Sequence, residues 1–129
     1  MRTKLALLSS LVFVGCASMH DLSSGRNSFG GGVSSTEIRP GFFRILARTN
    51  WAPWSNFSAA KSSWQAVANS ACGEGKWKEI SFTEEARDAG IQQMGVLSYI
   101  VTERVGYALC QNAATTEAEA KALASANTL

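Results

Sequence analysis

The chain has 129 residues, of which 46% are hydrophobic, and its formal net charge is +2. Two of its 12 basic residues, Arg2 and Lys4, lie in an N-terminal leader; without them, ten basic residues face ten acidic ones. Because a neutral surface has no electrostatic attraction for phosphate backbones, this balance argues against nucleic acid as a partner.

The leader has the form of a secretory signal. A basic start is followed by an apolar run over residues 5–14, which is shorter than the ~20 residues of a membrane-spanning helix. The run ends in Phe13-Val14-Gly15-Cys16, which resembles the lipobox of bacterial lipoproteins, although Phe13 replaces the usual leucine. We expect residues 1–15 to be a signal peptide and Cys16 to be lipidated; the alternative is ordinary cleavage after Ala17.

The lipobox resemblance implies a firm membrane anchor. It implies three acyl chains, palmitate among them, whereas one chain alone gives only marginal binding. The residue after Cys16 is Ala17 rather than the aspartate that retains enterobacterial lipoproteins in the inner membrane. The expected location is therefore the outer membrane, facing the periplasm.

Lipidation of Cys16 leaves Cys72 and Cys110 as a pair. Disulfides form and persist in oxidising compartments such as the periplasm. We therefore expect these two cysteines to be bonded, which would stabilise the fold by roughly 4 kcal/mol in the chain-entropy model. The alternative is two separate buried thiols.

Composition divides the mature chain into three parts. Residues 16–32 are rich in Ser and Gly and are expected to be a flexible tether that follows the lipidated cysteine. Residues 33–112 are expected to form a small α+β domain. Residues 113–129 are rich in Ala, Thr and Glu, so we expect a disordered or weakly helical tail.

The first elements of the domain are two strands. Pro40-Gly41 is a turn signal between a strand at 34–38 and another at 42–49. The second strand alternates, which predicts one buried and one solvated face. The apolar face carries Phe43, Ile45 and Ala47, and the opposite face carries Arg44 and Arg48.

A helix is expected next, with Ser55 as its N-cap and its end near Cys72, followed by Gly73. Its apolar residues recur at helical spacing. They are Phe57, Ala60, Trp64, Val67, Ala68 and Ala71.

The last elements are two more extended segments. A strand at 76–84 is expected to place Ile80 and Phe82 on one face and Trp77 on the other. A polar connection at 85–95 then leads to a closing strand at 97–110, in which Gly106 indicates a bulge or a bend.

Element lengths predict how these segments meet. At ~1.5 Å per helical residue and ~3.3 Å per strand residue, the helix and the next strand are both ~27 to 30 Å long. An antiparallel closing strand therefore brings Cys110 back to Cys72. The expected architecture is one helix packed on an antiparallel sheet of three to four strands, with a disulfide from the end of the helix to the last strand.

These features together resemble small, uncharacterised proteobacterial lipoproteins. The shared features are the lipobox, the Ile-Arg-Pro-Gly-Phe turn at 38–42, the Trp-bearing helix ending in Cys72-Gly73, and the closing Gly-Tyr-Ala-Leu-Cys at 106–110. The resemblance implies location and fold, and it brings no catalytic residue or cofactor.

Candidate functional residues are few. The single histidine, His20, lies in the expected tether without a metal-ligand cluster, so we expect no metal site and no cofactor. A loop presents Trp51 and Trp54 beside Pro53, and indoles in loops stack on sugar rings or grip partners. Packing on the core is the alternative for these two tryptophans.

The function we expect is a non-enzymatic envelope lipoprotein whose periplasmic module binds a protein or cell-wall partner. The alternative is a module that binds glycans or peptidoglycan fragments, with Trp51, Trp54, Arg44 and Arg48 lining a groove. A third class is an enzyme that acts through Glu84, Glu85 and Asp88 as acid and base; a solvated acidic connection is the alternative for these residues.

Overall fold

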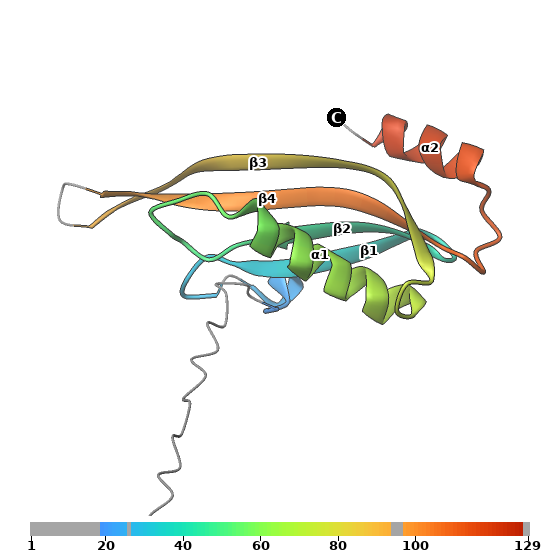
Figure 1. Ribbon diagram of the computed structural model, residues 1–129, viewed down its shortest axis with the longest axis horizontal. Helices are drawn as coiled ribbons and strands as arrows, with labels where there is room; N and C mark the ends of the chain where they lie inside the picture. Colours follow the sequence, from blue (N-terminus) through green and yellow to red (C-terminus); the bar gives the residue numbers. More distant parts are fainter. Residues whose placement is uncertain (1–18, 26, 94–96, 128–129) are drawn as a thin grey trace, which may run out of the picture.

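The computed structural model describes residues 19–25, 27–93 and 97–127. Among these, four antiparallel strands form one sheet in the order β1-β2-β4-β3, and two α-helices pack on it (Figure 1). The elements are β1 (Gly32–Arg39), β2 (Phe42–Arg48), α1 (Phe57–Cys72), β3 (Trp77–Gln93), β4 (Leu97–Cys110) and α2 (Glu117–Ala126). The expected α+β fold, a helix on an antiparallel sheet, is confirmed.

The expected disulfide joins α1 to the sheet. Cys72 at the end of α1 is bonded to Cys110 at the end of β4, with their Cα atoms 5.2 Å apart. Trp77, the first residue of β3, pairs with Cys110. The chain therefore returns to the end of α1, as the element lengths predict, and β4 lies inside the sheet between β2 and β3.

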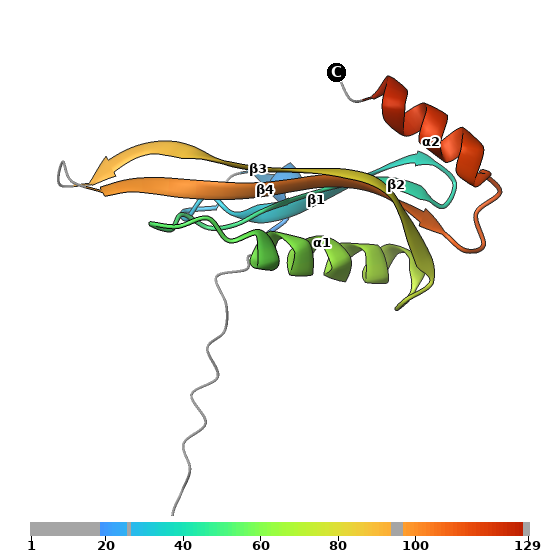
Figure 2. The same ribbon diagram turned by 45° about the horizontal axis from the view of Figure 1, so that its top comes forward.

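The sheet is covered on both faces near the disulfide end. Helix α1 lies on one face and α2 on the other (Figure 2). The cluster under α1 consists of Val33, Ile45, Ala47, Trp64, Ala68 and Ala108. The cluster under α2 consists of Phe42, Tyr107, Leu109, Ala120 and Ala124. Phe42 is 0% exposed, so the prediction that one face of this strand is solvated throughout is wrong at its α2 end.

Trp64 is the centre of the cluster under α1. Its indole is 0% exposed, donates a hydrogen bond from Nε1 to the carbonyl of Ile45 at 3.2 Å, and meets the ring of Trp77 edge-on. A Cβ on Gly106 would lie 3.0 Å from this indole. Gly106 therefore makes room for Trp64; the register shifts of the β3–β4 pair lie in β3 instead of at this glycine.

Helix α1 has well-defined ends. Its N-cap is Asn56, whose side chain accepts a hydrogen bond from the backbone of Ala59 at 3.0 Å. The expectation of Ser55 as the cap is wrong by one residue. The helix ends at Cys72, where Gly73 takes a φ of 93° that favours glycine, as expected.

Strand β3 is twice as long as the sequence predicts. Residues 85–93 were expected to belong to a polar connection, but they continue β3 and pair with β4 as far as Gln93 opposite Leu97. Charged side chains are tolerated here because β3 is an edge strand with exposed faces. One of them, Arg87, is paired across the sheet to Glu103.

A register shift between Glu79 and Ser81 changes which face each β3 residue occupies. Ile80 packs in the cluster under α2, whereas Trp77 packs in the cluster under α1. Phe82 also lies on the α1 face. The prediction that Ile80 and Phe82 share a face is therefore wrong, because simple alternation fails across a bulge.

The C-terminal segment forms a helix where disorder or weak helicity was expected. In α2, Thr116 and Glu119 make a capping box. Ala120 and Ala124 are buried against the sheet, and Lys78 of β3 forms an ion pair with Glu117 at 2.5 Å. Small side chains let the helix approach the sheet closely. Because the segment has few large apolar residues, its composition does not predict that it packs on the sheet.

The expected tether is in part folded onto β1. A short 3₁₀ helix, η1 (Leu22–Ser24), precedes β1, and the amide of Val33 donates to the carbonyl of His20 at 2.7 Å. Asp21 and Val33 form a parallel bridge. The expectation of a flexible tether is wrong for residues 19–25 and 27–32, while residues 1–15 and Cys16 lie outside the described residues.

Across residues 19–25, 27–93 and 97–127, no helix has the length and hydrophobicity needed to cross a membrane.

Candidate functional site

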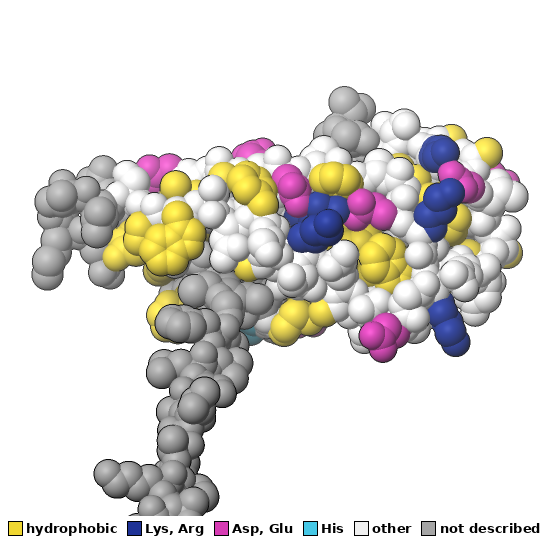
Figure 3. Space-filling model, in the orientation of Figure 1, with side chains coloured by type: hydrophobic (Ala, Val, Ile, Leu, Met, Phe, Trp, Pro, Cys, Tyr) yellow, Lys and Arg dark blue, Asp and Glu magenta, His cyan; other side chains and the backbone are white. Residues whose placement is uncertain are grey.

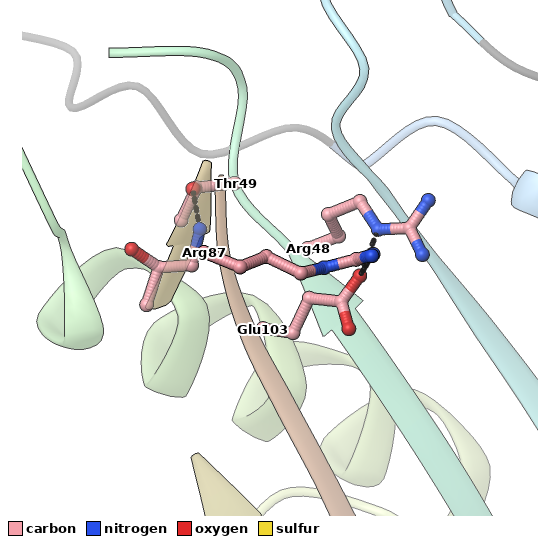
Figure 4. A network of polar contacts seen from close by, with 5 residues as sticks. Arg48, Thr49, Arg87 and Glu103 are labelled. Atoms are coloured by element: carbon pink, nitrogen blue, oxygen red, sulfur yellow. Dashed lines mark hydrogen bonds and ion pairs between the residues drawn. The ribbon is translucent and has the colours of Figure 1, made fainter. Parts of the chain in front are cut away.

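Two arginines and one glutamate meet on the face of the sheet that carries α2. Glu103 of β4 accepts hydrogen bonds at Oε1 from Arg48 Nε of β2 and from Arg87 Nη2 of β3, both at 2.5 Å. Figure 4 shows the two arginine side chains meeting at one oxygen of the carboxylate. Because β4 lies between β2 and β3, a central glutamate is reached from both neighbouring strands.

The three side chains differ in their exposure to solvent. The Glu103 side chain is 17% exposed, the Arg48 side chain 23% and the Arg87 side chain 51%. The hydrogen bond and charge of Glu103 raise the pKa of Arg87 above its ordinary value. Arg87 is therefore held in its charged form beside Glu103.

A hollow of about 340 Å³ opens beside this cluster. It lies between the N-terminal turn at 27–30, the loop after β2, and the projecting part of the β3–β4 hairpin. Its lining combines one indole, two guanidinium groups, a carboxylate and an amide. The lining residues are Asn27, Gly30, Arg48, Trp51, Arg87, Asp88, Ala89 and Val101.

Trp51 is held in the hollow by its neighbours. Its amide donates to the carbonyl of Phe29 at 3.0 Å. Gly30 has a φ of 80°, and a Cβ there would collide with the indole nitrogen of Trp51. The glycines at 30–32, which the sequence suggests are only a linker, thus let the indole lie directly against the backbone.

The loop that carries Trp51 is fixed to β4. Thr49 and Thr102 exchange two hydrogen bonds, with the amide of Thr102 donating to Thr49 Oγ1 at 3.0 Å (Figure 4). Ala52 and Ile100 form an antiparallel bridge. The loop therefore extends the pairing of β2 with β4 beyond Arg48, and a rigid loop positions binding groups better than a mobile one.

The structure brings together two of the four residues expected to contact a ligand. Arg48 and Trp51 line the same hollow. Arg44 lines a different hollow of about 310 Å³ on the same sheet face, beside Tyr107 and the end of α2. Trp54 is 58% exposed and lines none of these hollows.

Sequence reasoning missed Arg87 and Glu103. The polar sequence around Arg87 favours a connection over a strand, and a glutamate within a strand carries no signal of its own. The available signal was the charge-rich run over 84–88, which is compatible with an edge strand as well as with a loop.

A second charged cluster lies on the α1 face and is part of the core. Arg104 is 2% exposed, and its guanidinium lies 3.7 Å from the ring centre of Phe82 and 5.5 Å from that of Trp64. It pairs with Glu79 and Glu84. Glu84 is thus an ion-pair partner of the buried Arg104. Glu85, the next residue along the strand, points to the opposite face of the sheet.

In the part of the chain that the structure describes, no group of three or more His, Cys, Asp or Glu side chains is placed to hold a metal ion.

Fold and site together define a disulfide-containing α+β domain with a rigid aromatic and charged hollow at one end of its sheet. The disulfide is consistent with a location outside the cytoplasm. Comparison with family models, with curated proteins and with solved structures finds no match for this chain.

Proposed function

We propose that this protein is a cell-envelope lipoprotein, anchored through acylated Cys16, whose folded domain is a non-enzymatic binding module facing the periplasm. The observation that carries the proposal is the Cys72–Cys110 bond, since structural disulfides belong to oxidising compartments. It complements the lipobox-like residues 13–16 of the sequence. The outer membrane is the proposed location because Ala17 follows the cysteine.

Mass spectrometry of the mature protein tests the anchor. The expected mature chain begins at Cys16 and carries acyl groups, and a Cys16→Ser variant loses them. Thiol reagents are expected to label Cys72 and Cys110 only after reduction. A mature chain that begins after Ala17 without fatty acid would refute the proposal and support ordinary cleavage.

A partner search tests the binding role. The native protein is crosslinked in intact envelopes and recovered, and Arg87→Glu is compared with the wild type because it reverses one charge of the hollow. A partner that is recovered reproducibly with the wild type and lost with Arg87→Glu supports the proposal. Failure to recover any reproducible partner counts against it.

The hollow favours a second candidate function, the binding of a glycan or peptidoglycan fragment. Sugar rings stack on indoles and take hydrogen bonds from planar polar groups. The hollow offers Trp51 together with Asn27, Arg48, Arg87 and Asp88. Two arginines, Arg48 and Arg87, lie beside two carboxylates, Asp88 and Glu103, so the formal charges around the hollow balance. This balance suits an uncharged or weakly charged sugar unit better than a strong anion.

A pair of tryptophan variants tests this candidate. Soluble muropeptides are titrated into the protein, and binding is followed by isothermal titration calorimetry. Trp51→Ala is expected to abolish binding, whereas Trp54→Ala, which removes an indole outside the hollow, is the matched control and keeps it. Equal binding by the two variants would exclude the hollow as the glycan site.

A further inference from the structure

The folded N-terminal segment shortens the connection between the domain and its proposed anchor. The carbonyl of His20 accepts a hydrogen bond from the amide of Val33, and Asp21 forms a parallel β-bridge with Val33. Gly32 leaves no room between them, since a Cβ there would lie 2.5 Å from the carbonyl oxygen of His20. Residues 20–25 and 27–32 are therefore part of the folded body.

The remaining connection is only a few residues long. Three peptide units join Cys16 to Met19, and they reach at most about 11 Å when fully extended. A free tether over 16–32 would instead have a root-mean-square length of roughly 23 Å. An acylated Cys16 would therefore hold Met19 within about 11 Å of the residue that carries the lipid.

The most exposed large hydrophobic residues of the described chain lie at this end. Phe29 is 66% exposed, Trp54 is 58% exposed and Met19 is 55% exposed. The turn at 27–30 precedes β1 directly, and it is joined to the tryptophan loop by the hydrogen bond between Trp51 and Phe29. Figure 3 shows hydrophobic side chains gathered at the end from which the β3–β4 hairpin projects.

We propose that this docking end, defined by Met19, Phe29 and Trp54, packs on the surface of the bilayer that holds the protein's own acyl chains. The proposal rests on the acylation of Cys16. Aromatic side chains with an apolar body and a polar edge favour the membrane–water interface. The anchor makes docking intramolecular, so that a contact too weak to bind a free protein becomes persistent.

The position of these three residues indicates that a bilayer, and not a protein partner, covers the docking end. A hydrophobic patch that is exposed without a partner marks an interaction surface. The bilayer is the surface nearest to this patch, because Cys16, the proposed anchor, lies only three positions before Met19. A protein partner would have to displace that bilayer.

Fluorescence quenching by brominated lipids tests the proposal. The mature lipidated protein is reconstituted into vesicles of phosphatidylethanolamine and phosphatidylglycerol, with part of the lipid brominated on its acyl chains. Trp54 is expected to be quenched and the core indole of Trp64, which is 0% exposed, to be protected. Trp54→Tyr is expected to reduce the quenched fraction about twofold, since the interfacial indole is then absent.

Two further variants separate docking from general hydrophobicity. Phe29→Ser is expected to reduce the quenching of Trp54, because it weakens the same contact. Phe82→Ser removes an aromatic ring of similar exposure, 49%, from the middle of β3 and is expected to leave quenching unchanged. Circular dichroism verifies that each variant is folded.

The outcomes distinguish this inference from the proposed function. Equal quenching of the wild type and Trp54→Tyr, in protein whose mass includes the acyl groups, overturns docking and leaves the lipoprotein proposal intact. Reduced quenching in Phe82→Ser to the same degree as in Phe29→Ser also overturns it. A mature protein without acyl groups refutes both proposals.

Discussion

Removal of the disulfide is the perturbation whose size the structure predicts most directly. Cys72 and Cys110 are separated by 38 residues and join the end of α1 to the end of β4. Closing a loop of this length lowers the entropy of the unfolded chain enough to stabilise the fold by about 4 kcal/mol at 25 °C in the chain-entropy model. Small domains have total stabilities of about 5–15 kcal/mol, so the loss is a large share.

The double variant Cys72→Ala/Cys110→Ala isolates this contribution. Its free energy of unfolding in urea is expected to be about 4 kcal/mol below that of the oxidised wild type. Its melting temperature is expected to fall by roughly 15 °C, at about 4 °C per kcal/mol for a domain of this size. Both changes are measured by circular dichroism, which follows α1 and the sheet together.

Reductant provides the matched control. The wild type in dithiothreitol is expected to unfold like the double variant, while dithiothreitol is expected to leave the double variant unchanged. A loss below about 1 kcal/mol in both the variant and the reduced wild type would refute the reasoning, because the loop-closure entropy would then have no measurable effect.

Three other predictions concern the core, acid stability and a close contact. Arg104→Met leaves two carboxylates without their buried cation and is expected to cost about 2–4 kcal/mol in urea unfolding; an unchanged midpoint would contradict this. Hydrogen bonds from Lys121 and Lys78 lower the pKa of Glu117 from 4.5 to about 2, so the stabilisation by this carboxylate is complete above pH 4.5 and is lost as the pH falls through 2. Glu117→Gln is expected to flatten the stability curve in that window, and a wild-type slope in this variant would contradict the expectation. Gly106→Ala is expected to cost about 1–3 kcal/mol and to alter the near-ultraviolet signal of Trp64, which the new methyl group approaches to 3.0 Å; a wild-type melting temperature would show that the contact relaxes freely.

Helix α1, strand β4 and the disulfide were predictable because their signals are local or depend on length alone. Apolar residues at helical spacing, with Gly73 after the last turn, indicate α1 without reference to the rest of the molecule. The bounds of β4 agree with those predicted for the closing strand. Element lengths then place Cys110 beside Cys72, as observed.

Only part of the candidate site was predictable. Trp51 stood out because an indole in a loop is unusual, and Arg48 because it faces away from the apolar side of its strand. Arg87 and Glu103 became site residues through the β3–β4 pairing, which brings Arg87 within 2.5 Å of a glutamate 16 residues away. No local pattern encodes that distance.

The sequence by itself determined the elements whose backbone preferences and burial can be read from neighbouring residues. Tertiary structure decided the rest: the charged half of β3, the alanine helix α2 and the folded segment before β1. Each of these is polar or small in composition, and its stability comes from contacts with distant strands, such as Lys78 with Glu117 and Val33 with His20. Such segments gain order only when the sheet is already there to pair with them.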